Sequence, residues 1–229
     1  MNLQEAMLER HSVRSYKDQP ISGEIKEKLM SFIEECNEES GLHMQLITDE
    51  PKAFANFLCH YGMFKGVKNY IALVGPDNKN LDELCGYFGE KVVLFAQMLG
   101  LNTCWVMTTY KKVMDVISVG PGEKLRLVIA IGYGENQGKL SRSKKMKQVS
   151  NVTSSSPEWF KNGVYAALLA PTAVNQQKFK LTLMEGTAGN LTKSKVIAEA
   201  LKGPCSKIDL GIVKYHFELG AGAETFDWV

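Results

Sequence analysis

The sequence predicts a mixed α/β chain of the α+β class. Segments with helical periodicity alternate with short runs rich in β-branched and aromatic residues, which is typical of this class. The 229 residues have 45% hydrophobic content, which is enough to bury a substantial core. This length fits one large domain or two small, closely packed ones.

Apolar residues recur at helical spacing within the first hundred residues. Leu3, Ala6 and Met7 share one face of a short first helix. A second helix is predicted after Ser22, a residue type that often caps helix N-termini. Residues 81–100 are long and periodic enough to form a central helix.

Five short runs are predicted to be strands, because they are rich in β-branched and aromatic residues and are bounded by Gly or Pro. They are residues 43–48, 69–75, 103–108, 125–132 and 178–184. Between the fourth and fifth runs, residues 136–157 are polar, basic and then serine-rich. This composition predicts a connector.

After the connector, the pattern of the chain starts again. Residues 156–183 follow the plan of residues 22–48, with a cap, a helix, a break, a glutamine and a strand. Residues 208–228 likewise resemble residues 83–105 in pattern more than in identity. We therefore expect an internal duplication, with halves at 1–149 and 150–229.

Composition excludes several classes of function. The net charge is only +2 and the pI about 8.2, so no global field attracts nucleic acid or acidic membranes. No stretch approaches the roughly 18 apolar residues of a membrane span, and the N-terminus has no signal-like apolar region. Five cysteines without CxxC spacing and four scattered histidines predict neither a disulfide framework nor a metal site. We expect a soluble, cytoplasmic protein.

The first chemically suggestive stretch is "RHSVR", Arg10 to Arg14. It places a guanidinium, a hydroxyl and a second guanidinium at alternate positions where a helix gives way to an extended turn. This arrangement suits a phosphate and a second acceptor on the same ligand. A solvated charged surface is the alternative for these residues taken alone.

The second stretch is "PTAVNQQ", between an alanine-rich helix and a strand. Pro171 prevents the helix from continuing, while Thr172 and Ala173 keep the turn slim, so backbone amides can approach a flat ligand. Asn175 and Gln177 both donate and accept hydrogen bonds, which suits the edge of a heterocycle. A polar helix C-cap is the alternative.

Two further features concern phosphate binding. The basic run "SRSKKMK", with Arg142 and Lys144, is either an ordinary solvated linker or part of a phosphate site. Gly132 and Gly134 end a strand in a tight turn but form neither GxGxxG nor a P-loop, so a classical dinucleotide fold is unsupported.

Together these segments resemble the nitroreductase family of flavin enzymes, and in particular its TM nitroreductase subfamily with an internally duplicated chain. "ERHSVRSY", "EKVVLFAQMLGLNTCWV", "PGEKLRLVIAIGYGE" and "AALLAPTAVNQQKF" are similar to the family's RxSxR, its helix ending in GLGxxW, its strand ending in GY, and APSxxNxQPW. The last segment departs from the family, because it lies in the second half and has Lys178 and Phe179 where the family has proline and tryptophan.

The resemblance implies a nitroreductase-like fold, with a central mixed, mostly antiparallel sheet flanked by helices. It also implies that two similar halves form a pseudo-dimer in one chain that binds FMN; a true homodimer with two sites is the alternative. In the pseudo-dimer, one half retains RxSxR and the other retains PTAVN. The cofactor-binding residues that it implies are Arg10, His11, Ser12, Arg14, Arg142, Lys144, Pro171, Thr172, Ala173, Asn175 and Gln177.

Their roles follow from the same resemblance. Arg10 and Ser12 would contact the phosphate or ribityl chain, with a basic residue of 139–147, and Arg14 would lie near the pyrimidine end of the ring. The turn would line the ring, braced by Gln177.

The implied reaction is hydride transfer from NAD(P)H through FMN to a nitroaromatic, a quinone or a similar small acceptor, without a catalytic side chain or a metal. Membrane and nucleic-acid partners are not expected. The alternative is a flavin-binding carrier or sensor without turnover, and a relic without cofactor is a third reading. The acceptor and the choice between NADH and NADPH stay open.

Overall fold

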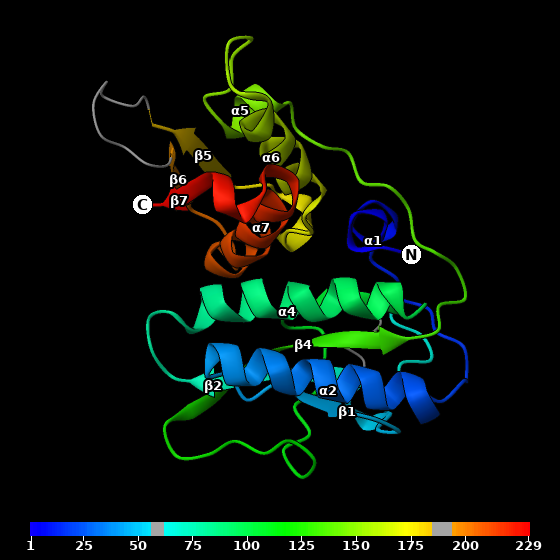
Figure 1. Cartoon of the computed structure of the whole chain (residues 1–229). Coiled ribbons are helices and arrows are strands. Elements are labelled where there is room, and N and C mark those ends of the chain that lie inside the picture. The colour runs from blue at the N-terminus through cyan, green and yellow to red at the C-terminus, as the bar shows by residue number, and fades with distance from the viewer. Residues whose placement is uncertain (56–61, 185–193) are drawn as a thin grey trace. The chain divides into compact units, whose positions relative to one another are not determined.

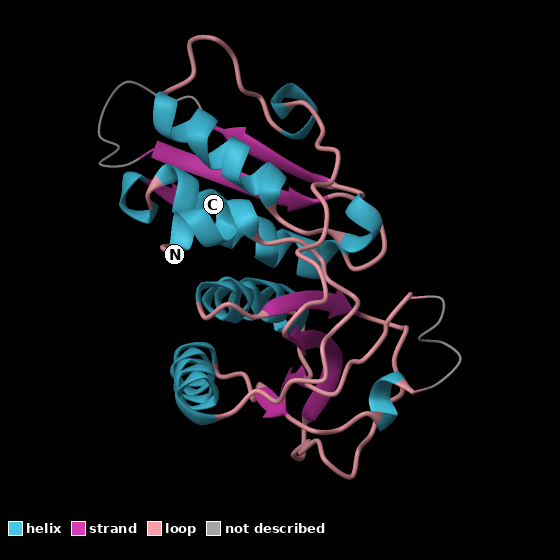
Figure 2. Cartoon of the chain, turned by 90° about the vertical axis from the view of Figure 1, so that its right-hand side faces the viewer, coloured by secondary structure: helices cyan, strands magenta, loops and turns pink. Residues whose placement is uncertain are grey.

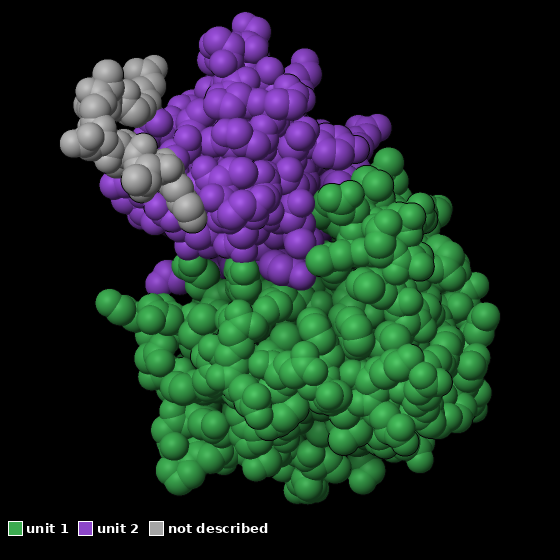
Figure 3. Space-filling view, in the orientation of Figure 1, with its two compact units in different colours: residues 1–140 green, residues 141–229 purple. Residues whose placement is uncertain are grey.

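The computed structural model describes residues 1–55, 62–184 and 194–229; Cys59 and His60, which entered the metal and disulfide arguments, lie outside these ranges. The chain divides into two compact units, Met1–Leu140 and Ser141–Val229 (Figures 1 and 3). This division precedes the predicted one at 149/150, because the helix at Met146–Val149 packs within the second unit.

In its described residues, the first unit contains a four-stranded sheet and the helices α1 (Leu3–Glu9), α2 (Gly23–Ser40) and α4 (Leu81–Met98) (Figure 1). A 3-10 turn, η1, spans Lys52–Phe54. The strands are β1 (Gln45–Ile47), β2 (Tyr70–Pro76), β3 (Asn102–Val106) and β4 (Glu123–Gly132). Every predicted element of this unit is confirmed, with small differences at the ends.

The sheet has the strand order β1-β2-β4-β3, and each neighbouring pair is antiparallel. Helix α4 packs on β2, β3 and β4, while α2 packs on α4 and β1. At the start of α2, Ser22 occupies the predicted N-cap position, but its side chain makes no capping hydrogen bond.

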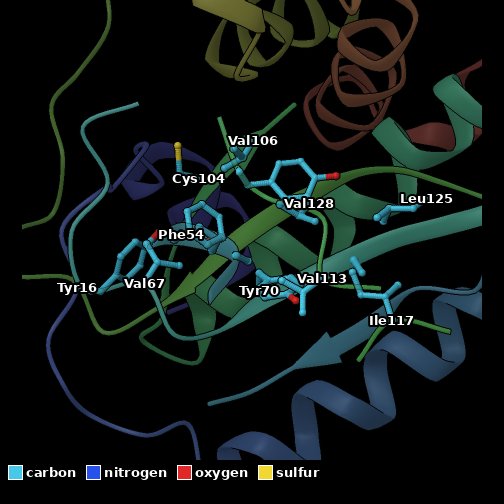
Figure 4. Packing of buried hydrophobic residues seen from close by; sticks show 14 of the residues in the cluster. Tyr16, Phe54, Val67, Tyr70, Cys104, Val106, Val113, Ile117, Leu125 and Val128 are labelled. Atoms are coloured by element: carbon cyan, nitrogen blue, oxygen red, sulfur yellow. Dashed lines mark hydrogen bonds between the residues drawn. The ribbon is translucent and has the colours of Figure 1, made fainter. Parts of the chain in front are cut away.

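Alternation along β2 gives the sheet two apolar faces. Tyr70, Ala72 and Val74 point into one hydrophobic cluster, shown in part in Figure 4. On the other face Leu73 lies close to Gly89 of α4, since a Cβ added there would be 3.3 Å from the Leu73 side chain. Both faces of the central strand are therefore buried.

A β-bulge in β4 adjusts this alternation. Leu73 pairs with Leu127 and Val74 with Leu125, which leaves Arg126 as the extra residue. The Arg126 guanidinium makes a two-point ion pair with Asp82 in the first turn of α4, with Nη2 3.0 Å from Oδ2. The bulge thus ties the start of α4 to the sheet.

The second unit contains a three-stranded sheet with two long helices (Figure 2). Its helices are α5 (Met146–Val149), α6 (Glu158–Leu169) and α7 (Ser206–Ala221), with 3-10 turns η2 (Ala173–Asn175) and η3 (Ala223–Thr225). Its strands are β5 (Phe179–Leu183), β6 (Ser194–Ala200) and β7 (Phe226–Trp228). β5 and β6 are antiparallel, and β6 and β7 are parallel.

The connector predicted at 136–157 is wrong in part. Residues 146–149 form α5, and Val149 and Val152 are buried. Two apolar side chains are enough to fix a short segment when neighbouring elements receive them, and composition averaged over the run obscures them.

Element order repeats between the units, but the sheets differ. Both units run helix, strand, antiparallel strand, helix, strand. In the first unit β2 pairs on its other side with the antiparallel strand β4, whereas β6 pairs there with the parallel strand β7. The internal duplication stays a prediction. Within the described residues no helix is both long and apolar enough to cross a membrane.

Small residues allow α6 and α7 to pack closely. A Cβ added at Gly220 would lie 2.5 Å from the Ala166 Cβ and 2.6 Å from the Asn162 carbonyl oxygen. A Cβ added at Gly163 would lie 2.7 Å from the Phe217 ring. Such distances are below normal contact, so glycine is required at this crossing.

We predict that Gly220→Ala lowers the free energy of unfolding by about 1–3 kcal/mol, because the new methyl group must push the two helices apart. Urea denaturation of the full chain measures this change. Ser154→Thr, which adds one methyl group at an exposed position, serves as the control. An unchanged midpoint for Gly220→Ala would contradict the close packing.

Candidate functional site

The segment that carries RxSxR is held against the sheet by backbone hydrogen bonds. Val13 N–H donates to the Thr103 carbonyl at 3.0 Å, beside a parallel bridge between Ser12 and Thr103. Further along, Tyr16 forms an antiparallel bridge with Gly134. The segment therefore extends the sheet beyond β3, where alternate side chains share a side.

Arg10, Ser12 and Arg14 gather around one buried thiol, that of Cys104. Burial raises the pKa of Cys104, while Arg14, a hydrogen bond from Ser12 and Arg10 oppose the rise. Arg14 itself is exposed. All three residues of the RxSxR segment thus act on the same buried group; their roles toward a cofactor stay a prediction.

Arg10 is the least accessible of the three. It is 9% exposed, and its Nε lies 3.7 Å from the carboxylate of fully buried Glu90. Burial lowers the pKa of Arg10, while Glu90 opposes that change. The second Glu90 oxygen accepts a hydrogen bond from the Trp105 indole at 3.0 Å.

Sequence reasoning missed Glu90, although a carboxylate among the apolar residues of the central helix is a usable signal.

The predicted site residue His11 contacts the end of α1. Its Nδ1 lies 2.8 Å from the Glu9 carbonyl. That contact directs one ring nitrogen back to the helix.

The predicted turn after α6 has an unusual backbone. The helix ends at Leu169, two residues before Pro171, as predicted. Val174, Asn175 and Gln177 then have φ values of 46°, 54° and 46°. Left-handed backbone in residues other than glycine costs of order 1–3 kcal/mol each, and a β-branched valine is the least suited of all. Val174 is also 90% exposed.

Residues 142–144 hold one end of this turn. The Arg142 carbonyl accepts hydrogen bonds from the Asn175 amide at 2.8 Å and the Gln177 amide at 3.2 Å. Lys144 donates from its backbone N–H to the Gln177 side chain at 2.7 Å and from Nζ to the Gln177 carbonyl at 2.8 Å.

Four predicted residues therefore meet in one cluster within the second unit, through contacts to each other. Gln177 is only 2% exposed, and its amide also donates to the Asn175 side chain at 2.9 Å. The amide groups of Asn175 and Gln177 are thus occupied by the protein, whereas the Arg142 guanidinium side chain is exposed.

Asp209, in the first turn of α7, holds the other end of the turn. It is 3% exposed. One carboxylate oxygen accepts a hydrogen bond from the Ala173 N–H at 3.0 Å, and the other accepts from the Gln176 side chain at 2.7 Å. Sequence reasoning missed Asp209, although an acidic residue between Ile208 and Leu210 interrupts an apolar helix face and so marks a buried polar contact.

A separate recess of about 400 Å³ lies in the first unit. Its lining includes Lys17, Lys26 and Lys68, but none of the predicted site residues. Lys68 pairs with Asp18 at 2.6 Å and Lys26 donates to Thr48 at 3.2 Å. Among residues 1–55, 62–184 and 194–229, no group of three His, Cys, Asp or Glu side chains is placed to hold a metal.

The Asp209 carboxyl predicts a pH dependence of stability. Burial raises its pKa from 3.8 to about 6, against the opposing hydrogen bonds from Gln176 and Ala173. The folded state therefore binds this proton more tightly than the unfolded state does. Its contribution to stability is largest below pH 4 and is lost as pH rises toward 6, by up to about 3 kcal/mol.

We expect the free energy of unfolding of the wild type, relative to Asp209→Asn, to fall between pH 4.5 and pH 7.5. Urea denaturation at several pH values measures this difference. Other carboxyls titrate in both proteins, so the difference isolates Asp209. A difference that stays constant or grows with pH would rule out the raised pKa.

Comparison with known proteins supports the fold. A "putative nitroreductase" from Thermotoga maritima is 21% identical, with a TM-score of 0.66, and the match covers 98% of this chain and 85% of that one. Two structures named "putative NADH dehydrogenase/NAD(P)H nitroreductase" have TM-scores of 0.51. The one from Bacteroides thetaiotaomicron is 18% identical, and its match covers 64% of this chain and 95% of that one. The one from Parabacteroides distasonis is 21% identical, with 65% and 97% covered.

At these identities the structural likeness shows the fold alone, and no curated protein matches the chain. The family model described as "Putative TM nitroreductase" matches residues 2–221. Since that match spans nearly the whole sequence, the chain belongs to this nitroreductase family and has the general role of an oxidoreductase.

Proposed function

We propose that the protein binds FMN and passes hydride from NAD(P)H to a nitroaromatic, a quinone or a similar small acceptor. The observation that carries this proposal is the extended RxSxR segment held along β3, with Arg10, Ser12 and Arg14 all acting on Cys104, in a chain of the nitroreductase family. Two solved structures with the same fold are named NAD(P)H nitroreductases, which supports the choice of reductant.

The residues at the phosphate side fit an anionic group. Arg10 and Ser12 are the residues proposed for this side, whereas exposed Arg14, which no ion pair of the described residues engages, has its charge available to the ring end of the ligand. The Ser12 hydroxyl adds a hydrogen-bonding group on the same side of the extended segment. Arg10 would contribute through its outer guanidinium nitrogens while Glu90 balances its charge.

In this proposal the turn approaches the flat part of the cofactor with its slim side and not with its amide groups. Because the Asn175 and Gln177 amides bond to the Arg142 carbonyl, they hold the turn in shape. The slim side formed by Thr172 and Ala173 would then approach the ring. His11 and Pro171 would border the site, and Arg142 with Lys144 would supply charge near the phosphate.

FMN, when bound, supplies the hydride chemistry. The protein supplies position and charge: Arg14 near the pyrimidine end would stabilise negative charge that develops on the reduced ring. No side chain has to act as nucleophile or general base in this scheme. An oxidoreductase of this kind therefore needs neither a triad nor a pair of carboxylates.

The proposal includes a single chain with two similar halves, one FMN per chain and a reducing cytoplasm. Burial raises the pKa of Cys36 to about 11 and of Cys85 to about 12, so both thiols are protonated and unreactive near neutral pH. Native mass measurement with flavin counting decides the assembly. A dimer with two flavins that require both chains would replace the single-chain arrangement.

A carrier without turnover is the competing function, because the two family motifs lie in different halves. Anaerobic addition of NADH or NADPH to the purified flavin-bound protein separates the two. Rapid bleaching of the flavin absorbance supports an oxidoreductase that uses these donors. Flavin that stays oxidised for many minutes with both donors favours the carrier.

We predict that Arg14→Ala and Asn175→Ala each weaken FMN binding by about tenfold or more, because the first removes a charge and the second unties the turn from Arg142. Flavin fluorescence titration measures Kd, and circular dichroism checks the fold. Lys17→Ala, which removes an exposed cation from the same N-terminal segment, is the control. Unchanged Kd values in both variants would mean that the site lies elsewhere.

A further inference from the structure

The turn 172–177 needs an anchor from a rigid element. Its left-handed residues favour other conformations when they are free, so contacts with the rest of the second unit help the turn's own hydrogen bonds to select this one. Within the turn, residues 142–144 bond to Asn175 and Gln177, and they belong to an irregular segment. Ala173, on the slim side of the turn, is bonded instead to Asp209 of a helix.

Asp209 is well placed to act as that anchor. Its own backbone N–H donates to the Cys205 carbonyl at 2.9 Å, which fixes it in the first turn of α7. Gln176, which donates to the carboxylate, also donates to the Pro204 carbonyl at 2.7 Å. The turn and the start of α7 are therefore joined at three points.

The segment before α7 is shaped to receive Gln176. A Cβ added at Gly203 would lie 2.4 Å from the Gln176 side-chain oxygen, so only glycine leaves room there. Cys205, the N-cap residue, has left-handed backbone with φ 55°. The turn and the segment before α7, which both contain left-handed residues, therefore meet at Asp209.

A carboxylate suits this position better than a carboxamide, although its burial raises its pKa. Its two oxygens accept from Ala173 and Gln176 at the same time, and bonds to a charged acceptor are the stronger kind. Asparagine at 209 could accept from one of them, but its own amide would then face the Gln176 amide, and two donors cannot bond to each other. The buried charge lowers stability, which is typical of groups kept for position rather than for folding.

We propose that Asp209 is a positioning residue that fixes Ala173 and Gln176, and with them the side of the turn that approaches the flavin ring. This inference rests on the proposed function. Asp209 acts through the turn and does not touch the cofactor itself. Its removal therefore loosens the turn while α6, α7 and the first unit keep their folds.

The first test needs no flavin. Hydrogen exchange of the Ala173 amide, followed by NMR in the flavin-free full chain, reports its bond to Asp209. We expect at least tenfold faster exchange in Asp209→Ala and a smaller increase in Asp209→Asn. Glu158→Gln, a neutralised and highly exposed carboxylate on α6, should leave this amide unchanged.

The second test links the turn to the cofactor. FMN affinity at pH 7.5 should fall about tenfold in Asp209→Asn and further in Asp209→Ala. Asparagine adopts left-handed backbone more readily than valine, so Val174→Asn should restore part of the FMN affinity that Asp209→Asn loses. The double variant is compared with Val174→Asn alone, so that any direct effect of the new asparagine is subtracted. A purely structural role for Asp209 gives no such rescue.

Each outcome is decisive. Unchanged Ala173 exchange in both Asp209 variants overturns the anchor, and unchanged FMN affinity despite faster exchange overturns its link to the cofactor. If Asp209→Ala does not fold, Asp209→Asn decides. If the wild type binds no FMN, the proposed function fails, and the exchange experiment still decides whether Asp209 anchors the turn.

Discussion

Left-handed backbone at Val174, Asn175 and Gln177 is the constraint on which the candidate site depends. None of the three is glycine, so the conformation needs bonds that select it, both within the turn and at its two ends. The Arg142 carbonyl and Lys144 satisfy one end, and the Asp209 carboxylate satisfies the other. The polar side chains of the turn therefore mainly stabilise its backbone conformation.

In the first unit, too, some polar groups of the candidate site are engaged by the protein while others face solvent. Ser12 and Val13 are fixed through main-chain pairing with β3, which leaves their segment extended. Arg10 is buried against Glu90, whereas Arg14 is exposed. One cation is thus neutralised by the protein, and the other faces solvent, where an anionic ligand can meet it.

Sequence patterns predicted those helices and strands whose buried face can be read from the spacing of apolar residues within the element itself. The periodicity of residues 81–100 and the β-branched run at 125–132 each describe a local face, and both became α4 and β4. Strands β6 and β7 were missed because they are short or partly exposed, and α5 was missed because two buried valines are hidden in a polar run.

The site was predictable to a similar extent. Family motifs pointed to RxSxR and to the turn, since these are contiguous in sequence. Glu90 and Asp209 were not found, because each acquires its role from a partner that is distant along the chain. A carboxylate on an apolar helix face was the available signal in both cases.

The glycine-lined crossing of α6 and α7 has a consequence for the site. Helix α6 leads directly into Pro171, and Asp209 is the fourth residue of α7, so the close crossing at Gly163 and Gly220 joins the two helices that carry the turn and its anchor. The same two glycines that allow this crossing therefore also set how far apart the turn and Asp209 are held, because each lies on one of these helices or at its end.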